Sequence, residues 1–162
     1  MTGTVTDAQM IQAYEETEYR VLGESPFVLK IGQANSDLLR LYRQQSVSTS
    51  VFITAWNPFS HAYDDTHNNK FNLDLAHDLV ALELNFIDGI GQHPSGDWPG
   101  EDSFLVFGTT IDSAKLLGVT YRQNAIIWSD SDGVPQLVLL QSNPSVAART
   151  VFLLYFYFIG IS

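Results

Sequence analysis

The chain of 162 residues contains no cysteine. This absence excludes disulfides, thiolate metal sites and a cysteine nucleophile, and it fits a reducing compartment. Residues 1–10 also show no basic stretch followed by an apolar run, the pattern of a secretory signal. We therefore expect a cytoplasmic protein.

Basic side chains are scarce, with 8 Lys and Arg against 18 Asp and Glu and a net charge of −10. Affinity for a phosphate backbone depends on Lys and Arg, so we expect no nucleic-acid partner. The acids are spread along the chain without a dense block. Their pattern favours a role in solubility over imitation of DNA.

Several catalytic signatures are missing as well. The chain has no glycine-rich phosphate loop ending in Lys-Ser or Lys-Thr, no G-x-S-x-G elbow and no H-E-x-x-H. Gly89-Ile90-Gly91 lacks the third glycine of a dinucleotide fingerprint. A serine hydrolase would need Ser60 or Ser103 beside a histidine. We accordingly expect no cofactor.

Polar and aromatic side chains do gather at the ends of three apolar runs. The run from Val51 stops at Trp56-Asn57-Pro58, the segment 96–103 leads into Phe104–Phe107, and Arg122-Gln123-Asn124 precedes Ala125–Trp128. In open sheets ligands tend to sit where strands end. These three segments predict a site.

The same segments carry a resemblance to the bacterial family known as domain of unknown function 3293. That family reads T-A-x-N-P at a strand, W-x-E-x-S opening a second strand, and Q-N-A before a third. The matching residues are Thr54, Ala55, Asn57 and Pro58, then Trp98, Glu101 and Ser103, then Gln123, Asn124 and Ala125. The resemblance covers roughly residues 10–142 and implies an architecture, because the family has no assigned activity.

Alternating helical and extended patterns predict the order α-β-α-β-α-β-β-α-β-β. The expected helices are about 7–19, one around 38–42, one from Lys70 to Leu82 and about 112–121; the expected strands are 27–31, 50–57, 85–91, 103–108, 124–128 and 136–141. This order predicts an α/β or α+β fold: a mixed sheet of about six strands with helices packed against it. Residues 1–145 are expected to form one globular domain.

The segment 146–162 is different, because Val151–Ile161 is an unbroken apolar run. It is too short to span a bilayer as a helix, so we expect no membrane partner. Its aromatic and branched content favours an extra strand buried in the domain's own core. An exposed apolar patch would instead form a self-association surface, and we expect a homodimer through this tail.

Seven residues are candidates for a site. Glu101 is the candidate catalytic residue; the candidate ligand contacts are Trp56, Asn57, Trp98, Ser103, Gln123 and Asn124. A carboxylate beside an indole is desolvated and suits general acid-base chemistry or ligand binding. Each residue also has a structural interpretation: Trp98 as a plug at the core's edge, Glu101 as a surface or capping group, and the amides as turn or cap residues.

The histidines give no comparable signal. His61, Asp64, Asp65 and His67 lie close in sequence and are potential metal ligands, but a loop fixes no geometry, and a solvated polar turn is the favoured interpretation. We expect no metal site. His93 precedes a Pro/Gly-rich loop and is either a pocket residue or an ordinary surface side chain.

Three functions remain open on these grounds. The leading hypothesis is a small-molecule binding domain for a polar, partly planar nucleotide-like or nucleobase-like ligand. The alternatives are a metal-independent hydrolase or transferase using Glu101, and a protein-interaction or inhibitory protein. The sequence leaves open whether there is catalysis.

Overall fold

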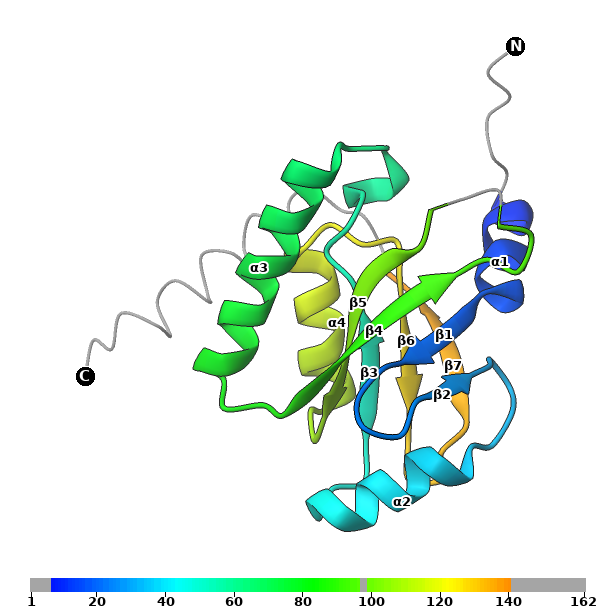
Figure 1. The fold of residues 1–162 in the computed structure, drawn as a ribbon, viewed down its shortest axis with the longest axis vertical. Coiled ribbons are helices and arrows are strands. Elements are labelled where there is room, and N and C mark those ends of the chain that lie inside the picture. The colour runs from blue at the N-terminus through cyan, green and yellow to red at the C-terminus, as the bar shows by residue number, and fades with distance from the viewer. Residues whose placement is uncertain (1–6, 97–98, 141–162) are drawn as a thin grey trace.

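The computed structural model describes residues 7–96 and 99–140, which form a single α/β domain (Figure 1). In these residues four α-helices and a short 3-10 helix accompany one seven-stranded sheet. The helices are α1 (Asp7–Glu16), α2 (Ser36–Gln45), η1 (Pro58–Ser60), α3 (Asp65–Ala81) and α4 (Ile111–Thr120). The strands are β1 (Glu18–Val21), β2 (Phe27–Leu29), β3 (Ser50–Ile53), β4 (Phe86–Gln92), β5 (Glu101–Phe107), β6 (Ala125–Ser129) and β7 (Pro135–Leu139). The predicted fold class is confirmed.

The strands lie in the order β2-β1-β4-β5-β3-β6-β7. We expected a mixed sheet, but all six neighbouring pairs are antiparallel. The reason is that each helical crossover skips one strand position: β5 lies between β3 and β4, which α3 connects, and β3 lies between β5 and β6, which α4 connects. The unit from β3 to β6 therefore has the split β-α-β order of ferredoxin-like folds.

Both faces of the sheet are buried, so the domain has three layers. Alternate residues of the central strands point to opposite faces: Val51 and Ile53 contact the cluster that contains Leu75 of α3 and Leu117 of α4, whereas Phe52 belongs to a second cluster. That second cluster includes the buried side chains Leu38 and Tyr42 of α2. Figure 1 shows α3 and α4 on one side of the sheet and α2 on the other.

Several element boundaries differ from prediction, among them the end of β3, which stops at Ile53 where a strand to residue 57 was predicted. The predicted helix at 7–19 ends at Glu16, and Glu18–Val21 forms the additional strand β1 between β2 and β4. Helix α3 begins at Asp65, five residues before the predicted Lys70, because the Asp64 side chain caps it by accepting a hydrogen bond from His67 N.

The apolar tail at 146–162 lies outside the described residues, so its place in the core or in a homodimer stays a prediction. Among the helices that the structure describes, none has the length and apolar character needed to cross a membrane.

Candidate functional site

The antiparallel sheet brings the three predicted polar segments to one edge. Strand β3 lies between β5 and β6 and runs opposite to both, so its carboxyl end meets their amino ends. The residues after β3, from Thr54 to Ser60, consequently lie beside Glu101, the first residue of β5, and Asn124, which precedes β6. Helix α1 supplies a further side chain, Tyr14, at the same edge.

Two buried asparagines of α3 brace the segment that follows β3. Asn72 accepts a hydrogen bond from the backbone N–H of Ala55 at 3.0 Å through its Oδ1. Asn68 accepts from the N–H of Asn57 at 2.9 Å, and its Nδ2 donates to the Asn57 side-chain oxygen at 2.9 Å. These bonds fix both the backbone and the side chain of Asn57.

The backbone of this segment is strained. Asn57, Phe59 and Ser60 have φ values of 47°, 54° and 60°, in the left-handed region that costs a residue with a side chain on the order of 1–3 kcal/mol. Hydrogen bonds hold it there, including Phe59 N to the Arg122 carbonyl at 2.7 Å. Backbone strain of this kind persists only where the surrounding structure maintains it. It is found most often at ligand sites and switch regions.

Asn57 and Glu101 form the central contact of the site. Asn57 Nδ2 donates to Glu101 Oε1 at 2.9 Å, while Asn57 Oδ1 accepts from Asn68 and from the N–H of Tyr63. Burial raises the pKa of the Glu101 carboxyl, and the bond from Asn57 opposes that rise. Within the described residues, Glu101 Oε2 accepts no hydrogen bond. One carboxylate oxygen is therefore held by Asn57, and the other is bonded to none of the described residues.

Tyr14, Ser60 and Asn124 add hydroxyl and amide groups next to this pair. Asn124 Nδ2 donates to Ser60 Oγ at 2.7 Å. Burial raises the pKa of Tyr14 to about 12, the negative charge of Glu101 adds to the rise, and the Ser60 hydroxyl opposes it. The phenol is thus neutral at physiological pH and close enough to Glu101 to feel its charge. We call Tyr14, Asn57, Ser60, Glu101 and Asn124 the Glu101 cluster.

The other predicted ligand contacts take different positions. Gln123 is buried and its Nε2 donates to the carbonyls of Trp56 and Tyr121, both at 3.1 Å. The Ser103 hydroxyl donates to the Glu101 carbonyl at 2.9 Å. Both side chains donate to backbone carbonyls, so they stabilise the backbone around the site and are not free to contact a ligand with these groups. Trp98 lies outside the described residues.

Trp56 has one feature that points to a ligand or an ordered water. Its Nε1–H is buried, and in the part of the chain that the structure describes it meets no acceptor. A buried donor without a partner costs about 1–3 kcal/mol, so native proteins retain few of them. Trp56 is adjacent in sequence to Asn57 of the Glu101 cluster.

The polar loop before α3 serves to start that helix. Asp64 caps α3, and His67 Nδ1 lies 2.7 Å from the Asp64 carboxylate. Across the described ranges 7–96 and 99–140, no three His, Asp or Glu side chains are arranged to hold a metal ion. His93 lies elsewhere, and its Nε2 is 3.0 Å from Glu16 Oε2, which ties the loop after β4 to the end of α1.

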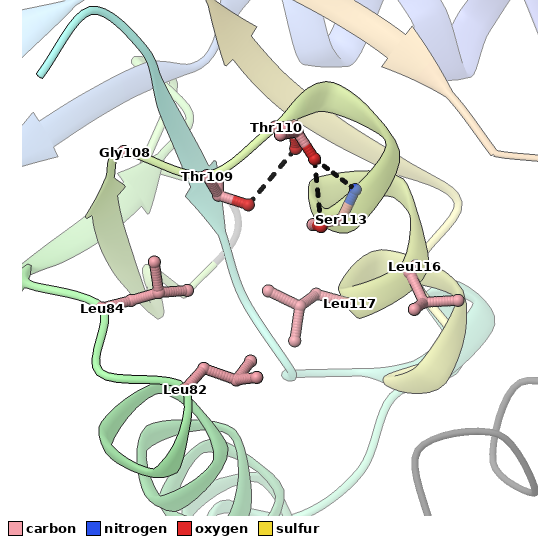
Figure 2. A pocket seen from close by; sticks show the side chains of 8 residues that line it. All are labelled: Leu82, Leu84, Gly108, Thr109, Thr110, Ser113, Leu116 and Leu117. Carbon is pink, nitrogen blue, oxygen red and sulfur yellow. Dashed lines mark hydrogen bonds between the residues drawn. The ribbon is translucent and has the colours of Figure 1, made fainter. Parts of the chain in front are cut away.

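A separate hollow of about 280 Å³ lies at the other end of β5. Figure 2 shows that leucines of α4 and of the end of α3 line it together with the hydroxyls that begin α4. Two of those hydroxyls donate hydrogen bonds within the turn: Thr109 donates to the Thr110 backbone carbonyl, and Thr110 donates to Ser113 Oγ at 3.0 Å. The polar groups of this hollow therefore serve the N-terminus of α4, and the rest of its lining is mainly leucine.

Sequence reasoning missed Tyr14 and the two bracing asparagines. Nothing in the sequence relates Tyr14 to Glu101, which is 87 positions away. Asn68 and Asn72 did carry a signal, because they extend the buried stripe of Leu75 and Leu79 toward the start of α3 at helical spacing. A buried stripe that turns polar next to a strand end indicates side chains bonded to backbone.

The family model described as "Protein of unknown function (DUF3293)" matches residues 53–126. The match begins at the last residue of β3 and ends in β6, so it contains Asn57, Ser60, Glu101 and Asn124 but not Tyr14. The resemblance seen in the sequence is confirmed over these residues. Neither the curated proteins nor the solved structures contain a significant match to the chain.

Proposed function

We propose that this domain binds a polar, partly planar small molecule, of nucleobase or nucleotide type, at the Glu101 cluster. The observation that carries the proposal is the half-engaged carboxylate of Glu101, held by Asn57 on strained backbone. Glu101 is half-buried, and the carboxylate oxygen that none of the described residues binds can accept a hydrogen bond from a ligand. Few basic residues accompany it, which favours a nucleobase or nucleoside over a highly phosphorylated ligand.

The neighbouring groups support a ligand with both a planar ring and polar edges. The exposed Phe59 ring and the Trp56 indole flank Asn57 in sequence and offer apolar surface. Asn57 and Ser60 offer hydrogen-bonding groups from the same short segment. Ligand sites commonly combine apolar lining with a few placed polar groups in this way.

Mass spectrometry of the natively purified protein tests the proposal directly. We expect a co-purifying small molecule in the parent protein and in Asp102→Asn, and its loss in Glu101→Gln. Asp102 is the matched control because it is the next carboxylate on β5 and its side chain is exposed. The absence of any bound species, together with no rise in melting temperature from a panel of nucleobases and nucleosides, would contradict binding.

The second candidate function is a metal-independent hydrolase or transferase. Burial raises the pKa of Glu101, and a carboxyl whose pKa lies above its ordinary value is better suited to act as a general acid or base. In that case Glu101→Gln should abolish turnover of the identified ligand and leave its affinity nearly unchanged. Loss of affinity without turnover in the parent would leave a pure binding domain.

A further inference from the structure

We infer that the edge of strand β7 binds the chain's own apolar segment 151–161 as an additional antiparallel strand, a role separate from ligand binding at the Glu101 cluster. Three features of the molecule support this contact. Strand β7 leaves backbone hydrogen-bonding groups unpaired, apolar side chains flank those groups on both faces of the sheet, and the described chain ends beside them.

Strand β7 lies at one edge of the sheet and, within the described residues, pairs with β6 alone. Leu140 N donates to the Asn124 carbonyl at 2.9 Å, so the even-numbered positions along this strand direct their backbone groups to β6. The odd-numbered positions direct theirs away from it. The Pro135 carbonyl bonds to the loop after β2, whereas no described backbone group pairs with the N–H and C=O of Leu137 and Leu139.

The opposite edge of the sheet is protected against further pairing. Strand β2 has three residues, follows Pro26 and precedes Lys30. Its Val28 carbonyl accepts a hydrogen bond from Asn35 Nδ2 at 3.0 Å. Short length, proline and lysine are common devices that keep an edge from pairing. Strand β7 has five residues and no charge, and its proline is its first residue, so its edge lacks this protection.

Apolar side chains flank the β7 edge on both faces of the sheet. Val138 and Leu140 are half-buried against the cluster that contains α3 and α4, and Leu137 is half-buried against the cluster that contains α2. Leu139 remains 48% exposed. Side chains of a strand placed beside β7 would therefore have apolar neighbours on either face.

The segment 151–161 matches this environment. It is an unbroken apolar run of aromatic and branched residues, the composition of a strand with both faces covered. The residues 141–150 join it to β7 and include Asn143-Pro144, a pair that favours a turn. A link of this length extends up to about 33 Å, enough to reverse direction. Attachment to the same chain also gives the segment a high effective concentration at this edge, which favours it over a second copy.

Amide hydrogen exchange in the full-length chain, followed by NMR, tests the pairing at single residues. The amides of Gln136 and Val138 face β6 and serve as internal references. We expect the amides of Leu137 and Leu139 to exchange at least about tenfold more slowly than unpaired amides, because a further strand would hold their protons. Exchange of Leu137 and Leu139 at the unpaired rate, beside protected Gln136 and Val138, would overturn the inference.

A double proline variant, Leu154→Pro with Tyr155→Pro, tests which segment provides that protection. Successive N–H groups of a strand point to opposite sides, so one of the two removed groups faces β7 in either register. The variant should lose the protection of Leu139 and keep that of Val138. Ala147→Pro with Ala148→Pro adds two prolines to the link instead and should keep both. Protection of Leu139 that survives the first variant would exclude segment 151–161.

A mixture of isotope-labelled and unlabelled full-length chains distinguishes the chain's own segment from that of a second copy. Nuclear Overhauser contacts between β7 and residues 151–161 within one chain would support the inference. The same contacts between a labelled and an unlabelled chain would overturn it, because they would show a segment exchanged between two copies.

Discussion

The two ends of strand β5 differ in how their polar groups are used. We call the end at Glu101 the near end and the end at Phe107 the far end. At the far end, Thr109 and Thr110 line a visible hollow, yet both hydroxyls donate to neighbouring groups of the chain (Figure 2). At the near end, Glu101 and the indole of Trp56 keep hydrogen-bonding capacity that no described residue meets. Unmet polar capacity therefore distinguishes the near end more clearly than shape does.

The two ends of β5 also differ in backbone conformation. The near end contains three residues with positive φ within four positions, namely Asn57, Phe59 and Ser60. At the far end Gly108 has a φ of 78°, which is unstrained without a side chain, and Glu83, between two leucines that line the hollow, has a φ of 57°. Positive φ values of residues with side chains are therefore more numerous at the near end, where three fall within one short segment.

The largest effect on this contrast should come from Asn68→Ala. The change removes the acceptor for Asn57 N and the donor to Asn57 Oδ1, and it leaves both groups partly buried. We expect the free energy of unfolding to fall by about 2–3 kcal/mol, measured by urea denaturation. Asn69→Ala is the matched control, since Asn69 is the next residue of α3 and is exposed; it should change stability by less than about 0.5 kcal/mol. Equal effects of the two changes would refute the bracing role.

At the far end, Thr110→Ala should cost about 1 kcal/mol. Thr110 caps α4 by accepting a hydrogen bond from Ser113 N at 3.2 Å, and loss of such a cap exposes an unpaired helix N–H. Thr110→Ser keeps the hydroxyl and should restore most of the stability. Neither change should alter ligand affinity at the Glu101 cluster. A loss of affinity in Thr110→Ala would show that the two ends are coupled and would break the comparison.

Sequence patterns predicted most of this fold because its elements are strongly periodic. The apolar runs of β5 and β6 and the strand β4 between two turns were each recognised within a few residues. Strand β1 was missed because its four residues begin only one residue after α1, and the first two were assigned to the predicted helix. The antiparallel direction was not predictable from order alone, since it depends on which strand is inserted beside β3.

The site was predictable where its residues adjoin strand ends. Asn57, Glu101 and Asn124 stand next to β3, β5 and β6, so the end of an apolar run revealed them. The roles of Gln123 and Tyr14 were not predictable, because they depend on which atoms meet. Gln123 faces backbone carbonyls that no spacing reveals, and Tyr14 joins the cluster only through the position of α1.

The pH dependence of Glu101→Gln provides a smaller test of the near end. Burial raises the pKa of Glu101 in the folded state, so its ionisation costs stability as pH rises from the unfolded value through the folded one. At low pH the parent and the variant should be equally stable, because a protonated Glu and a Gln are both neutral. As pH rises to 8, the variant should become the more stable protein in urea titrations. A gap that is constant with pH would show that Glu101 is not desolvated.

The smallest effect on global stability should come from His93→Ala, which tests how α1 is held over the near end. Helix α1 has half-buried residues such as Tyr14 but no fully buried one, and the contact of His93 Nε2 with Glu16 Oε2 at 3.0 Å links its last turn to the loop after β4. A partly exposed pair of this kind contributes roughly 0–1 kcal/mol, so the unfolding midpoint should hardly move. Amide exchange in α1 should nevertheless accelerate, because local opening depends on the few contacts that tie the helix down.

A second exposed pair supplies the control for that measurement. Asp74→Asn disrupts the pair of Lys70 Nζ and Asp74 Oδ2, which lie 3.0 Å apart on α3, far from α1 in sequence. It should leave exchange in α1 unchanged. If His93→Ala also leaves α1 protected, then the contacts of Tyr14 at the Glu101 cluster suffice to hold the helix. The contact between His93 and Glu16 would then make no contribution to the site, and α1 would be held at the near end by the Glu101 cluster itself.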